Sequence, residues 1–74
     1  MDANICGEKV KLYRKKLGMA QIELAEALNV DHDLAMAQSD ISEIERLARG
    51  VKDYELKALA EVLQVPVNEL LISE

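Results

Sequence analysis

Neither phenylalanine nor tryptophan occurs in the sequence, and two tyrosines are its only aromatic residues. Half of the 74 residues are hydrophobic nevertheless, so a core must be built from leucine, isoleucine, valine, alanine and methionine. Sheets favour β-branched and aromatic side chains, whereas leucine, alanine and methionine suit packed helices. The composition therefore favours an all-α fold.

Cysteine and histidine occur once each, as Cys6 and His32. One cysteine excludes an internal disulfide, and a structural zinc site needs several Cys and His ligands. The three glycines are far apart, so no glycine-rich phosphate loop is present. We expect no enzymatic activity, no cofactor, no metal and no small-molecule ligand, with Cys6 acting as a small packed residue.

Long apolar runs are also missing. No stretch approaches the roughly 20 residues that cross a bilayer, and the N-terminus lacks the pattern of a secretory signal. Internal repeats and linkers are absent, and 74 residues is the length of one small domain. We expect a single soluble, cytoplasmic domain over residues 1–74, with its core over about 5–72.

The net charge of −5 is unevenly distributed. Residues 1–20 carry five basic and two acidic side chains, whereas residues 21–45 carry seven acidic ones and no basic one. Phosphate binding needs clustered lysine and arginine. The basic run therefore favours either a phosphate-facing edge or an ordinary solvated helix face, and the overall acidity argues mildly against nucleic acid.

Apolar residues at helical spacing predict five short helices and no strand. We expect them over 4–17, 21–28, 38–47, 53–63 and about 67–71. Gly18 is expected to end the first and Asn29 the second, because both residue types favour the left-handed position after a helix. Ser39 or Asp40 is expected to cap the third, and Asp53 the fourth. Residues 31–36 do not indicate one conformation.

An ordered set of residues now resembles a known family, the phage-repressor and Cro type of helix-turn-helix domain (XRE family). The matching positions cover about 5–72 and are Val10-x-x-Tyr13-Arg14-x-x-Leu17-Gly18-Met19-Ala20-Gln21-x-x-Leu24-Ala25, Ile41-Ser42-x-Ile44-Glu45, Arg49, and Glu55-Leu56-x-x-Leu59-Ala60-x-x-Leu63-x-Val65-x-Val67-x-Glu69-Leu70-Leu71. The resemblance implies an all-α, five-helix, lambda-repressor-like fold that binds double-stranded DNA.

The resemblance also implies roles for particular residues. The second helix of the motif would turn four side chains toward base edges in the major groove: Gln38, Ser39, Ser42 and Glu43. Phosphate contacts would come from Gln21, Lys11, Lys15, Arg49 and Lys52. Arg14 and Glu45 would form an ion pair between the first and third helices.

Three features depart from the family pattern. Residues 30–37 lengthen the turn between the two motif helices, which we interpret as an insertion. Leu47 replaces the glycine that usually ends the recognition helix, and because leucine at positive φ is costly, we expect the helix to run on toward Gly50. Asp40 and Glu43 occupy a helix that often carries arginine or lysine.

Two functions follow. The first is a repressor-like transcriptional regulator, of bacterial or phage type, that binds a short operator as a homodimer. Residues 70–72 are the first choice for its dimer surface, or they only close the core. The alternative is a protein-interaction module that lost DNA binding and uses its acidic segment, with Ile22 and Met36 as exposed apolar contacts.

Overall fold

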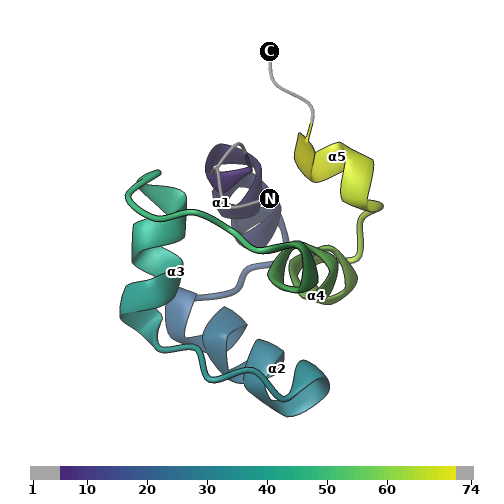
Figure 1. Cartoon of the computed structure of the whole chain (residues 1–74). Helices are drawn as coiled ribbons and strands as arrows, with labels where there is room; N and C mark the ends of the chain where they lie inside the picture. Colours follow the sequence, from purple (N-terminus) through teal and green to yellow (C-terminus); the bar gives the residue numbers. More distant parts are fainter. Residues whose placement is uncertain (1–5, 72–74) are drawn as a thin grey trace.

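The computed structural model describes residues 6–71, and this part of the chain consists of helices and connecting loops without a strand. The helices are α1 (Gly7–Lys16), α2 (Gln21–His32), α3 (Gln38–Glu45), α4 (Asp53–Leu63) and α5 (Val67–Leu71). In Figure 1, α2 and α3 form the lower and left edges of the molecule, α4 lies centrally, and α5 lies at the upper right. The expected all-α, five-helix fold is confirmed.

The core lies where these helices meet, and it consists almost wholly of aliphatic side chains. The residues predicted to face inward from α2 and α4 are all buried: Leu24, Ala25, Leu28, Leu56, Leu59, Ala60 and Leu63. Ile41 and Ile44 of α3 and Leu70 of α5 are fully buried too. Leu70 therefore closes the core, while Ile72 lies outside the described residues.

The second helix is longer than predicted. It runs past Asn29 to His32, and Asp33 takes the left-handed position with φ 56°. Asn29 serves the loop instead, because its side chain donates to the carbonyl of Met36 (2.8 Å) and accepts that residue's N–H (2.7 Å). The connection between α2 and α3 is thus 33–37, and part of the supposed insertion is helix.

The third helix ends earlier than predicted. Leu47 adopts the left-handed conformation, with φ 61°, and is half exposed. Its N–H donates to the Ile44 carbonyl (3.1 Å) and that of Ala48 to the Glu43 carbonyl (2.7 Å). This pair of bonds is the Schellman arrangement, which satisfies the last carbonyls of a helix. The expected run toward Gly50 was wrong, because these bonds offset the cost of a leucine at positive φ.

Gly18 follows α1 in the left-handed conformation (φ 71°), as predicted. The predicted caps of α3 and α4 were wrong by one to three residues, although the acids near them do cap. Ala37 precedes α3, and Asp40 in its first turn accepts the Ala37 N–H at 2.8 Å. Lys52 precedes α4, and Glu55 accepts the Lys52 N–H at 3.0 Å. Each carboxylate therefore satisfies one of the N–H groups that a helix start leaves without a partner.

Candidate nucleic-acid interface

The position of α3 is fixed by a buried ion pair to α1. Arg14 Nε donates to Glu45 Oε2 at 2.6 Å, and Arg14 Nη2 donates to Glu45 Oε1 at 3.0 Å. Both side chains are at least 90% buried. The guanidinium also donates to the carbonyl of Met19 (2.7 Å), which ties the loop before α2 to the same pair. Three elements of the motif are thus held by one arginine.

Gln21, in the first turn of α2, also forms a hydrogen bond with the carboxylate of this ion pair. Gln21 Nε2 donates to Glu45 Oε1 at 3.0 Å, and Gln21 Oε1 accepts from Gln38 Nε2 at 3.3 Å. A carboxylate only accepts hydrogen bonds, so Gln21 must turn its NH₂ group toward Glu45. Gln21, for which we expect a phosphate contact, is therefore already engaged, although its second amide N–H is not used by these bonds.

The outward face of α3 carries the four residues expected to contact bases. Gln38 and Ser39 are exposed, while Ser42 and Glu43 are half-buried. Their spacing places them on one side of the helix, since positions three and four apart are neighbours. The opposite side is packed by Ile41, Ile44 and Glu45. The structure brings the four together on a face that the core does not use.

Arg46 belongs to this face as well, and the sequence reasoning missed it. It is exposed, directly follows α3, and keeps near-helical backbone angles (φ −89°, ψ 4°). Its Nε donates to Ser42 Oγ at 3.3 Å. The signal was the spacing of four from Ser42, because residues four apart lie on the same face of a helix.

Arg49, expected to contact phosphate, lies partly buried against α4. Its Nη1 and Nη2 donate to Glu55 Oε1 (3.3 Å) and Oε2 (3.1 Å). The hydrogen bonds that Arg49 donates to Glu55 raise the pKa of Arg49 above its usual range, and the charges of Glu55, Asp40 and Glu43 add to this. Much of its charge is therefore balanced within the protein.

The remaining expected phosphate contacts are exposed lysines. Lys11 and Lys15 lie one turn apart on the solvent side of α1, and Lys52 lies directly before α4. The lysines of α1 share that helix with Arg14, which faces α3. They are placed at the edges of the motif and not on α3 itself.

The acidic segment is less open than its charge suggests. Glu23 accepts the Ala20 N–H at 2.6 Å, Asp40 caps α3, and Glu45 is buried with Arg14. Met36, expected to be exposed, is buried in the core, while Ile22 is exposed as expected. The interaction-module alternative therefore loses part of the acidic and apolar surface on which it depended.

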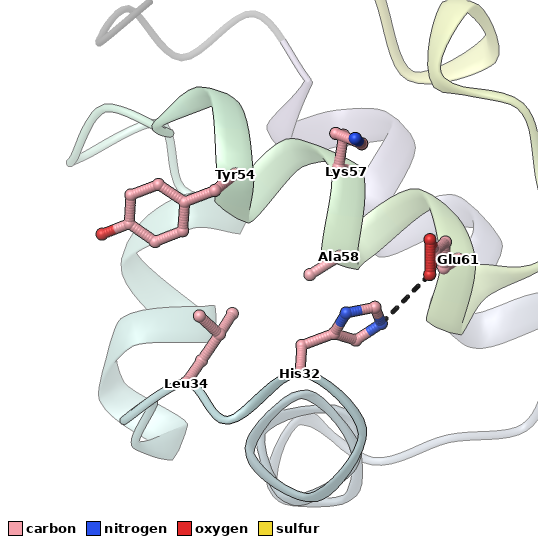
Figure 2. A pocket seen from close by; sticks show the side chains of 6 residues that line it. All are labelled: His32, Leu34, Tyr54, Lys57, Ala58 and Glu61. Atoms are coloured by element: carbon pink, nitrogen blue, oxygen red, sulfur yellow. Dashed lines mark ion pairs between the residues drawn. The ribbon is translucent and has the colours of Figure 1, made fainter.

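A groove of about 300 Å³ lies between the end of α2 and α4, separate from the outward face of α3. Figure 2 shows His32 pointing toward Glu61 at one end of this groove, with Leu34 and Tyr54 at the other. His32 Nε2 lies 3.5 Å from Glu61 Oε1. Among residues 6–71, no group of three His, Cys, Asp or Glu side chains is arranged to hold a metal ion. No described helix is long and apolar enough to cross a membrane.

The geometry is that of a helix-turn-helix: two helices joined by a short loop, the second with a polar outward face. The helix-turn-helix family model matches residues 10–70. The chain therefore belongs to the helix-turn-helix family, a class of DNA-binding regulators and not of enzymes. No curated protein matches it.

Solved structures of DNA-binding regulators are similar to the chain. The N-terminal DNA-binding domain of SinR from Bacillus subtilis is 32% identical, with 96% of each chain covered and a TM-score of 0.79. SinR, the master regulator for biofilm formation, in complex with DNA is 34% identical, with 90% of this chain and 98% of that chain covered and a TM-score of 0.77. The restriction-modification controller protein C.AhdI from Aeromonas hydrophila is 25% identical, with 90% and 92% covered and a TM-score of 0.69.

Proposed function

We propose that this protein is a transcriptional regulator that binds a short operator in double-stranded DNA as a homodimer, with α3 in the major groove. The observation that carries the proposal is the outward face of α3, which has side chains able to pair with bases and no role in the core. A likeness to SinR, whose structure was solved in complex with DNA, supports it.

Base contacts are assigned to the polar side chains of that face. Gln38 suits adenine, since an amide both donates to N7 and accepts from N6. Ser39 and Ser42 donate or accept, and Glu43 accepts from the amino group of cytosine. The first turn of a recognition helix normally lies deepest in the groove. Gln38 and Ser39 are therefore expected to contribute most of the discrimination between bases.

Affinity is assigned to groups at the edges of the motif. Lys11, Lys15 and Lys52 are exposed cations, and Gln21 adds an amide donor at the start of α2, where the helix dipole favours a phosphate. Arg49 retains unused N–H groups but is paired with Glu55. We therefore expect the lysines to set the salt dependence of binding, with Arg49 contributing less.

The test is selection of the full chain on a pool of random duplexes, followed by affinity measurements at several salt concentrations. We expect an enriched sequence whose two half-sites lie about one helical turn apart, as for a dimer. Lys11→Ala/Lys15→Ala should lower affinity for all sequences and flatten the salt slope by about 0.9 per lost contact. Gln38→Ala should instead lower specificity. Failure to enrich any sequence with salt-dependent binding would overturn the proposal.

A further inference from the structure

Asn29, in the last turn of α2, binds both backbone groups of one residue in the loop that follows. Its Nδ2 donates to the Met36 carbonyl (2.8 Å) and its Oδ1 accepts the Met36 N–H (2.7 Å). A backbone N–H can only donate and a carbonyl can only accept, so this pairing fixes the orientation of the amide. The half-buried Asn29 side chain therefore binds Met36 as a neighbouring backbone segment would.

The loop between α2 and α3 has few hydrogen bonds of its own. Residues 34–36 take part in no backbone–backbone hydrogen bond within the described part of the chain. Asp33, at the start of the loop, takes the left-handed conformation with φ 56°. Figure 1 shows the loop running back alongside α2 to the start of α3. The Asn29 side chain thus supplies hydrogen bonds that the loop does not make within itself.

Met36 connects this pairing to α3. Its side chain is buried in the core, and its backbone directly precedes Ala37, the residue before α3. At the opposite end, Glu45 is the last residue of α3 and is buried with Arg14. The helix is therefore held at both ends, by the ion pair at one and by the Asn29–Met36 pairing at the other.

The first turn of α3 carries Gln38 and Ser39, to which most of the discrimination between bases is assigned. Gln38 also donates to Gln21 at 3.3 Å, but this bond is exposed and longer than either bond of Asn29. An exposed hydrogen bond contributes less to holding the helix because water competes for both groups. Without the Asn29–Met36 pairing, the start of α3 can move relative to α2.

We propose that Asn29 is a positioning residue for base recognition. It contacts no DNA itself, but through Met36 it holds the first turn of α3 at the place in the major groove that Gln38 and Ser39 require. Base contacts depend on the exact position of these side chains, whereas phosphate contacts at the edges of the motif depend on it less. This inference rests on the proposed function and adds to it a specificity-determining residue outside the outward face of α3.

The specificity ratio tests this inference. It is the affinity of the full chain for its enriched duplex divided by the affinity for a scrambled duplex of the same length, both measured by fluorescence anisotropy. A variant that is only less stable lowers both affinities by the same factor, the folded fraction, so its ratio is unchanged. Asn29→Ala removes both bonds to Met36. We expect its ratio to fall roughly 5- to 100-fold, the range of one well-placed base contact.

Two further variants separate positioning from stability. Val62→Ala trims a half-buried side chain of α4 and should destabilise the fold, yet change the ratio by less than about 2-fold. Asn29→Asp keeps the acceptor for the Met36 N–H but turns an oxygen that cannot donate toward the Met36 carbonyl, so its ratio should fall as well. In two-dimensional amide NMR spectra of the free protein, Asn29→Ala should shift the signals of Gln38 and Ser39, whereas Val62→Ala should leave them in place.

A wild-type ratio in Asn29→Ala would overturn the inference while leaving operator binding in place, and so would signals of Gln38 and Ser39 that do not move. Equal falls in the ratio for Asn29→Ala and Val62→Ala would do the same, because a general loosening of the fold would then explain both. A wild-type ratio in Asn29→Asp would contradict the need for the bond to the Met36 carbonyl. A wild-type chain that enriches no duplex fails at the earlier step, and it is then the proposed function that falls.

Discussion

Removing the Glu45 carboxylate tests what the buried ion pair contributes to the stability of the fold, separately from any contact with DNA. Glu45→Ala removes both acceptors of Arg14 and the acceptor of Gln21, and leaves a buried guanidinium whose remaining bond is to the Met19 carbonyl. Breaking a buried pair by removing one partner costs about 3–5 kcal/mol, because the other charge stays without compensation. A chain of 74 residues has a free energy of unfolding of roughly 4–11 kcal/mol. The variant should therefore keep at most about 8 kcal/mol and be unfolded if the wild type lies at the lower end of this range.

Urea denaturation followed by circular dichroism measures this loss, and thermal unfolding checks it. At about 4–8 °C per kcal/mol, Glu45→Ala should lower the Tm by roughly 12–40 °C. The double variant Arg14→Met/Glu45→Leu removes both charges and keeps similar volumes, so it should recover most of the stability. If Glu45→Ala costs under about 1 kcal/mol, the ion pair does not hold α1 and α3 together. If the double variant is no more stable than the single one, the loss does not come from an uncompensated buried charge.

Two further changes test the packing of α1. Gly7→Ala places a Cβ that overlaps the Ile44 carbonyl oxygen, so it should lower the free energy of unfolding by about 1–3 kcal/mol, as overpacking does. Helix propensity alone would instead raise the free energy of unfolding by about 1 kcal/mol. Urea denaturation shows which of the two effects is larger. The hydrogen bond that Tyr13 donates to Glu69 raises the pKa of the tyrosine. This bond therefore stabilises the folded protein below the ordinary pKa of tyrosine, and the stabilisation is lost as the pH rises through the raised pKa of Tyr13. Tyr13→Phe should therefore flatten the fall in stability above about pH 10, and an unchanged alkaline limb of the unfolding curve would contradict this.

The helices of the core were predictable because their apolar spacing is strong and their environment is simple. The helical spacing correctly predicts that four leucines are buried: Leu24 and Leu28 in α2, and Leu59 and Leu63 in α4. Ends were harder, since a residue type that favours a cap competes with tertiary contacts. Asn29 suits a helix end by type, yet its amide pairs with both backbone groups of Met36 and the helix continues.

The end of α3 before Leu47 could not be predicted from residue type either. Leucine disfavours positive φ when considered alone, but the bonds from Leu47 and Ala48 back to α3 outweigh that preference. An end at Glu45 also moves Arg46 from a helix interior to the last position of the outward face. The residues of that face, Arg46 included, were therefore predictable from spacing, whereas the end of the helix depended on a left-handed conformation that leucine does not favour.

A count of charged residues does not show which acidic side chains are already bonded within the protein. Several acids in and next to the motif accept hydrogen bonds from the backbone or an arginine: Glu23, Asp40, Glu45 and Glu55. The overall charge of −5 still acts at long range and lowers the attraction to any DNA, whatever its sequence. Contacts to bases act only at a matching site. We therefore expect weak non-specific binding and a shallow salt slope, so that base contacts on α3 determine a large share of the specificity ratio.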